Sequence, residues 1–298
     1  ERALYLGKNL GKNLGKNLGK NLGESLEFSC ISAVERMALA NQVSSADIKV
    51  IVLAQSNTKQ GIDIENAIIV TSLAKALQQI DVLVAQNALV ALVGVNDKQS
   101  ERFAKQELTT ISFDQTFNGY QHCEGVAALL FAPVSFVQSN NSYVYSWLKG
   151  FAVGDDVAHV TASALDNAQV SVTDIALLEV SALTQQPSLE ANGLFLSYTQ
   201  GEKLTTAISC ARSLTGEGEG FSQVLGLLRT AIALQQRYIP AITDWQQPLS
   251  DELEKLQESS LYFPTESRPW YPNQDGSSHL ARHSPPRRRV SRSHGPPS

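Results

Sequence analysis

Apolar, β-branched runs alternate with helical segments along most of this chain, and this alternation constrains its fold more than any other feature. Ile48–Ala54 is a nearly continuous β-branched run, which predicts a strand buried on both faces. Further strands are predicted at Ala88–Val95, Val126–Ala132, Tyr143–Val153, Ile175–Val180 and Ala207–Cys210, and Ile68–Val70 is a shorter apolar run. Helices are predicted at Phe28–Ala40, Ser72–Ala85, Thr161–Gln169, Ser188–Thr199 and Pro248–Glu258, the last with Asp251 as its N-cap. The sequence therefore predicts a layered α/β domain whose sheets are covered on both faces.

A glycine-dense turn and a long apolar helix follow the last strand of this alternation. Gly216, Gly218 and Gly220 form the turn, and from Phe221 the apolar residues recur with a helical period. Apolar residues outside that stripe predict a helix buried on most sides. Gly226 in its middle costs about 1 kcal/mol relative to alanine, which favours a close approach of another backbone there. This arrangement is typical of a loop that faces a catalytic or substrate site.

Composition and charge exclude several classes of protein. The 298 residues carry a net charge of −5, which argues against a nucleic-acid partner for the body of the chain. No apolar run reaches membrane-spanning length, and no signal peptide is recognisable. The three cysteines are widely spaced, without metal-ligand spacing, so we expect reduced thiols, no bound metal and a cytoplasmic location.

Both ends of the chain have unusual composition. Residues 7–22 are four tandem copies of Gly-Lys-Asn-Leu, for which we expect a flexible segment within 1–25. After Asp275 the chain contains five arginines and no acidic residue, and we expect residues 277–298 to be a disordered basic tail.

The glycine turn does not have the sequence of a phosphate-binding loop. It lacks the lysine and serine of a P-loop, and Glu217 and Glu219 would repel a phosphate. Two glutamates near a helix start more often complement the helix dipole.

No assembled catalytic group is evident from residue chemistry alone. The chain contains no G-x-S-x-G nucleophile motif. His122 and Cys123 are adjacent in sequence, but neighbouring side chains usually point in different directions, so a structural role is the better interpretation of both. His159 lies alone near a helix start, where packing or capping is more common than catalysis.

Several segments together resemble the β-ketoacyl synthases. These segments are Phe117–Gly125, Asp174–Ser181, Ser213–Gly218 and the helix and strand of Asp81–Asn96. A closer likeness is to the N-terminal ketosynthase-like region of the acyltransferase subunit of bacterial omega-3 polyunsaturated fatty acid synthases. It is carried by residues 1–5, 111–120, 177–182, 211–218, 236–241 and 268–272. The resemblance implies a reduced thiolase-like α/β/α/β/α sandwich over 26–263, followed by a linker over 264–276.

The resemblance also implies a site that has lost its chemistry. Ketosynthases use a cysteine nucleophile and two histidines. Here the first histidine position holds Ser181 and the second holds Glu217. The nucleophile position falls near 68–72, where Thr71 and Ser72 are the nearest hydroxyls and no cysteine occurs. No intact catalytic set is therefore expected.

The resemblance leaves three functional interpretations. The favoured one is a non-catalytic scaffold that forms a homodimer and contacts other synthase subunits and acyl carrier domains. A second keeps residual acyl transfer or thioester hydrolysis, with Thr71, Ser72 or Ser181 as nucleophile. A third binds acyl chains as a chain-length factor does. No cofactor is expected to bind directly, although acyl carrier phosphopantetheine or acyl-CoA thioesters would be the partners. The departure from the family after Gly276 indicates a frameshift or truncated reading frame near Ser277, which resequencing of the coding DNA would test.

Overall fold

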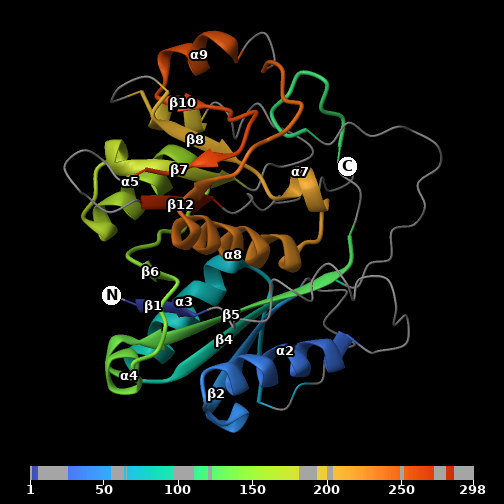
Figure 1. Cartoon of the computed structure of the whole chain (residues 1–298), viewed down its shortest axis with the longest axis vertical. Helices are drawn as coiled ribbons and strands as arrows, with labels where there is room; N and C mark the ends of the chain where they lie inside the picture. The colour runs from blue at the N-terminus through green and yellow to red at the C-terminus, as the bar shows by residue number, and fades with distance from the viewer. Residues whose placement is uncertain are drawn as a thin grey trace, which may run out of the picture.

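A computed structural model gives the structure of the chain (Figure 1). It describes residues 2–5, 26–54, 64, 66–96, 111–119, 123–180, 193–199, 204–248, 252–271 and 280–284.

Two large sheets organise these residues. The six-stranded sheet has the order β3 (Ile68–Val70), β2 (Ile48–Leu53), β4 (Leu89–Asn96), β5 (Gly125–Pro133), β1 (Arg2–Tyr5) and β6 (Ser146–Leu148). The second sheet has the order β10 (Leu261–Tyr262), β8 (Thr206–Ser209), β7 (Ile175–Val180) and β12 (Leu280–Ser284), all parallel. A small antiparallel ribbon joins β9 (Tyr238–Ile239) to β11 (Arg268–Pro269).

The helices cover both sheets on both faces (Figure 1). They are α2 (Leu26–Ala40), α3 (Leu73–Ala85), α4 (Val134–Asn140), α5 (Val157–Ala168), α7 (Arg212–Thr215), α8 (Gly220–Gln236) and α9 (Leu253–Glu258). Helix α2 packs on the outer face of the six-stranded sheet, α3 and α8 lie between the sheets, and α5 and α9 lie beyond the second sheet. The predicted layered α/β/α/β/α architecture is confirmed.

Four apolar clusters fill the spaces between these five layers. Strand β7 shows how one strand serves two of them, because Leu177 and Leu178 are fully buried on opposite faces. Leu178 packs with Phe195 on the outer side, whereas Leu177 packs with Ala233 and Trp270 on the side of α8. Alternating strand side chains that are all apolar are the physical basis of a sheet buried on both faces.

Most predicted elements are present within a few residues of their expected bounds. The structure confirms the strands predicted around 48–54, 88–95, 126–132, 175–180 and 207–210. Helix α8 is buried on most sides, as expected, with Ile232 among its few exposed residues. Helix α5 begins four residues before the predicted start, because the Asp156 side chain accepts a hydrogen bond from the backbone N–H of His159 (2.7 Å) and caps it. The cap predicted at Asp251 falls outside the described residues, as does the Gly-Lys-Asn-Leu repeat.

The strand predicted over Tyr143–Val153 is wrong for most of its length. Only Ser146–Leu148 pair in a sheet. At Gly150 the chain packs against the end of α5, where a Cβ atom would lie 2.8 Å from the backbone nitrogen of Ala168. The chain therefore leaves the sheet to reach α5.

Two segments predicted as flexible or disordered contribute strands. Arg2–Tyr5 pair with β5 and β6, and Leu280–Ser284 pair in parallel with β7. Both predictions rested on composition, but a strand edge can pair with any backbone that supplies N–H and C=O groups. The disordered-tail prediction is therefore wrong for Leu280–Ser284.

Candidate functional site

Four strands of the six-stranded sheet bring the sequence-predicted positions to one edge. Leu53 of β2 lies opposite Val70 of β3 and Gly94 of β4, and these three strands are parallel. Strand β5 runs the opposite way, with its first residue, Gly125, opposite Asn96. Parallel strands end at the same edge of a sheet. Thr71 and Ser72, which follow β3, and Cys123 and Glu124, which precede β5, therefore lie along this edge.

Helix α8 begins directly on the backbone of this edge. A Cβ atom added to Gly220 would lie 2.1 Å from the carbonyl oxygen of Leu53 and 3.1 Å from that of Val95. A Cβ atom on Gly94 would lie 2.3 Å from the Gly220 carbonyl oxygen. These glycines let a helix start touch the sheet backbone.

The glycine turn is tied to the segment before β5. The backbone N–H of Cys123 donates to the Glu217 carbonyl (2.9 Å), and Asn96 Nδ2 donates to the Cys123 carbonyl (2.5 Å). Gly218 lies so close that a Cβ atom there would be 2.9 Å from the Cys123 sulfur. The structure thus brings Cys123 and Glu217 together, a pairing that sequence distance could not indicate.

Glu217 is held by two strong contacts. Its Oε2 forms an ion pair with Arg212 Nη1 at 2.9 Å, and its Oε1 accepts from the backbone N–H of Glu219 at 2.8 Å. The Arg212 side chain is 4% exposed and that of Glu217 is 18% exposed. A carboxylate with both oxygens engaged in a partly buried ion pair is an anion fixed in place.

The turn stores backbone strain where it enters α8. Glu219 has φ 49° and ψ −114°, a region that is costly for any residue other than glycine. Ser222 offsets part of this cost, because its hydroxyl accepts from the N–H of Gly218 at 2.7 Å and donates to the Gly216 carbonyl at 3.3 Å. Ser222, in the first turn of α8, therefore stabilises the glycine turn that precedes the helix.

The hydroxyls at the predicted nucleophile position are in a helix-capping environment. The Ser72 hydroxyl accepts from the backbone N–H of Lys75 at 3.3 Å and caps α3, and Thr71 directly precedes it. His159 is the one histidine whose side chain the structure describes, and it lies on α5 beyond the second sheet. Among the described side chains, no imidazole can therefore activate either hydroxyl.

Ser181 and His122 lie outside the described residues. Strand β7 ends at Val180, immediately before Ser181, and its Glu179 lies opposite Ser209 of β8.

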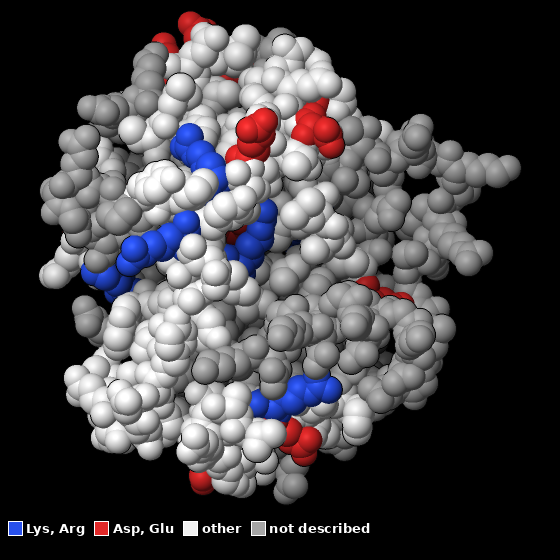
Figure 2. Space-filling model, in the orientation of Figure 1, with Lys and Arg blue, Asp and Glu red and all other residues white. Residues whose placement is uncertain are grey.

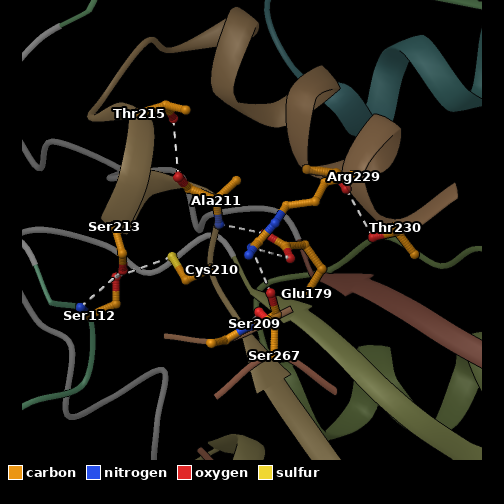
Figure 3. A network of polar contacts seen from close by, with 12 residues as sticks. Ser112, Glu179, Ser209, Cys210, Ala211, Ser213, Thr215, Arg229, Thr230 and Ser267 are labelled. Carbon is orange, nitrogen blue, oxygen red and sulfur yellow. Dashed lines mark hydrogen bonds and ion pairs between the residues drawn. The ribbon is translucent and has the colours of Figure 1, made fainter. Parts of the chain in front are cut away.

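A buried ion pair joins the second sheet to α8 (Figure 3). Arg229 Nη1 lies 3.0 Å from Glu179 Oε2 and donates to the Ser209 hydroxyl at 2.6 Å. Glu179 Oε1 also accepts from the backbone N–H of Ala211 at 2.6 Å. Burial raises the pKa of Glu179, although Arg229, Ser209 and Ala211 oppose this rise. No sequence motif indicates this pair, and its one local signal is a charged residue inside the apolar run of β7.

A second polar network fixes the loop before Cys123. The Ser112 hydroxyl lies 2.6 Å from that of Ser213 and donates to Cys210 Sγ at 3.2 Å. Asp114 accepts from the backbone N–H groups of Gln246 (2.7 Å) and Thr116 (2.9 Å). Burial acts to raise the pKa of Asp114, but these hydrogen bonds outweigh it and hold the pKa below its usual value. The loop is thus anchored both to α7 and to the segment after α8.

Cys123 is expected to react slowly with alkylating agents. Burial, and then the Glu217 carboxylate, raise the pKa of its thiol to about 11. At pH 8 the thiolate fraction, and so the iodoacetamide rate, should be about a hundredfold below that of an ordinary cysteine. Glu217→Gln removes the nearby anion and should accelerate the reaction. Mass spectrometry of the native protein measures this, with the fully buried Cys30 and Cys210 as internal controls. Labelling of Cys123 as fast as free glutathione would contradict the assignment.

Two further searches bear on the kind of site. No cluster of three or more His, Cys, Asp or Glu side chains that could hold a metal occurs in the described part of the chain. Within the same residues, no helix has the length and apolar character needed to cross a membrane.

Comparisons with known proteins identify this architecture. Residues 132–246 match the family described as "Beta-ketoacyl synthase, C-terminal domain". The polyketide synthase GfsE of Streptomyces halstedii is 26% identical over 179 residues, which are 54% of this chain and 5% of that protein.

Solved ketosynthases have the same fold. The ketosynthase from module 6 of the bacillaene synthase of Bacillus subtilis 168 has a TM-score of 0.71 at 14% identity. The match covers 85% of this chain and 55% of that one, so the chain spans about half of the solved domain. A type II polyketide ketosynthase solved with its acyl carrier protein, AntDE:AntF, has a TM-score of 0.63 at 13% identity, covering 84% of this chain and 81% of that one. The chain therefore carries a ketosynthase-like domain with a thiolase-like fold.

Proposed function

We propose that this chain is a degenerate, non-catalytic ketosynthase-like domain that scaffolds the acyltransferase subunit, of the PfaB type, of a polyunsaturated fatty acid synthase making eicosapentaenoic or docosahexaenoic acid. The observation that carries the proposal is the fixed Glu217 carboxylate, bound by Arg212 and by the Glu219 N–H. It occupies the position that resembles the second catalytic histidine of ketosynthases.

The chemistry of condensation explains why a glutamate at the histidine position matters. Acyl transfer develops negative charge on the thioester oxygen, and a site accelerates it with hydrogen-bond donors aimed at that oxygen. An ionised glutamate donates no hydrogen bond and repels the developing charge. Cys123 cannot replace the missing nucleophile, because its thiol stays protonated at neutral pH. Ser181 at the first histidine position supplies no general base either.

The scaffold role includes a homodimer and acyl carrier partners in the cytoplasm. Strand β3 is the last strand on one side of the six-stranded sheet within the described residues. Ile68 on this strand is 37% exposed, and Val82 on the adjoining α3 is 52% exposed. An apolar strand edge of this kind pairs readily with a second chain. The acyl carrier partner is supported by the similar ketosynthase that was solved with one.

Intact-mass analysis after incubation with acyl-CoA and acyl carrier protein tests the proposal. We expect no covalent adduct, because the Ser72 hydroxyl caps α3 and the one histidine whose side chain is described, His159, lies on α5 beyond the second sheet. A stable acyl adduct on Thr71, Ser72 or Ser181 would contradict the proposal and support residual acyl transfer or thioester hydrolysis. Saturable acyl binding without an adduct would instead support a role like that of a chain-length factor. In cells, Glu217→Ala in the full-length subunit should leave the lipid output almost unchanged.

A further inference from the structure

At the side of the six-stranded sheet opposite β3, the last strand among the described residues carries an exposed tryptophan. Strand β6 is the last strand there among the described residues, next to β1 at the left of Figure 1. In β6, Trp147 is exposed and Leu148 is half-buried, and Lys149, the residue directly after the strand, is exposed. Trp147 is 41% exposed. Trp147 and Lys149 are therefore two exposed side chains at an open edge, one within β6 and one directly after it.

Strand β6 and the residues before it are held in place by packing against the hydrophobic core. Leu148 and Tyr145 pack against the cluster between the sheet and α8. The Tyr143 hydroxyl accepts from Gln235 Nε2 of α8 at 2.8 Å, and its ring meets that of Tyr145 edge-on, with centroids 4.9 Å apart. A strand held in this way is already in the conformation that a partner strand needs, so little ordering is required on binding.

The residue types on this edge favour an acidic partner segment. Exposed edge strands are usually protected by charge or proline, whereas tryptophan is the residue most enriched at the energetic centres of interfaces. Lys149 forms no ion pair with another described residue, and it lies two positions from Trp147. A strand added along β6 would place an apolar side chain and a carboxylate, two residues apart, against this pair.

We propose that the β6 edge binds an extended acidic segment of a partner protein, which adds to the sheet as a further strand. The backbone of β6 supplies the hydrogen bonds, Trp147 packs against an apolar side chain, and Lys149 pairs with a carboxylate. This inference is independent of the proposed function, because it uses neither the glycine turn nor any acyl chemistry.

Fluorescence polarisation with labelled peptides tests it. The probe is the octapeptide Thr-Val-Thr-Glu-Thr-Val-Thr-Glu, in which each glutamate lies two residues from a valine on the same face of a strand, and its counterpart has lysine in place of both glutamates. We expect micromolar binding of the acidic peptide and at least tenfold weaker binding of the basic one. Trp147→Ala should weaken acidic-peptide binding by about tenfold or more. Lys149→Glu should reverse the preference between the two peptides, and Lys75→Glu on the exposed face of α3 should change nothing.

Three results would overturn the proposal. The first is equal affinity for the two peptides or no binding at all. The second is unchanged amide exchange in 146–149 when the acidic peptide binds, since strand addition must protect that backbone. The third is a change in the sedimentation mass of the protein alone on Trp147→Ala, because the edge would then pair with a second copy of the chain.

Discussion

A Gly220→Ala variant should lose at least about 3 kcal/mol of its free energy of unfolding, the upper end of the usual cost of overpacking. The added Cβ atom would lie 2.1 Å from the Leu53 carbonyl oxygen. That obstacle is sheet backbone in the middle of the molecule, so no rotamer change relieves the clash. Alanine would gain about 1 kcal/mol of helix propensity over glycine, which is too little to compensate.

Urea unfolding monitored by circular dichroism measures this loss. Gly154→Ala is the matched control, because the atom nearest its new Cβ would be a terminal carbon of Val160, at 2.9 Å, which can move. We expect that variant to unfold within about 1 kcal/mol of the wild type, as substitutions away from such features usually do. If Gly220→Ala were as stable as Gly154→Ala, the start of α8 could not lie against the Leu53 backbone as described.

Glu179→Ala should destabilise the protein by about 3–5 kcal/mol, the usual cost of removing one partner of a buried ion pair. It leaves Arg229, the Ser209 hydroxyl and the Ala211 N–H without the carboxylate that joins them. Glu179→Gln should cost less, because its amide oxygen still accepts a hydrogen bond, but it also leaves Arg229 without its counter-charge.

The pH dependence of the free energy of unfolding shows which protonation state of Glu179 stabilises the fold. The folded-state pKa of Glu179 is raised, so its favourable contribution is complete below the ordinary carboxyl pKa and is lost as pH rises through the raised value. The stability of the wild type relative to Glu179→Gln should therefore increase as the pH falls from 7 to 5. Denaturant titrations at both pH values measure the difference. If the difference in stability between the wild type and Glu179→Gln increased with rising pH, the ionised carboxylate would be the stabilising form.

Local sequence patterns predicted the layered architecture well. The continuous apolar runs of β2, β4 and β7 indicate strands buried on both faces, and the apolar stripes of α2, α3 and α8 indicate helices with a buried face. The short strands β1 and β12 escaped detection, because composition says little about backbone pairing. Strand β6 was overestimated in length, because the packing of Gly150 against α5 lies eighteen residues away in sequence.

The candidate site was likewise predicted only in part from the sequence. Resemblance located the degenerate positions Ser181, Glu217 and 68–72, and whether they have lost all acyl chemistry remains a prediction. Close backbone packing at Gly226 in the interior of α8 stays a prediction, and the structure shows backbone contacts of this kind at Gly94, Gly150 and Gly220.

The sequence by itself determined that this chain forms buried strands between covering helices, and that a glutamate stands in its glycine turn. Periodicity and residue identity are local properties, so they can be read without coordinates. The tertiary structure alone decided what surrounds that glutamate. The ion pair with Arg212 joins residues five positions apart in the turn, whereas the raised pKa of Cys123 depends on segments almost a hundred residues apart meeting at one sheet edge. Only folding buries the Cys123 thiol and brings it close enough to the Glu217 carboxylate for that charge to act on it.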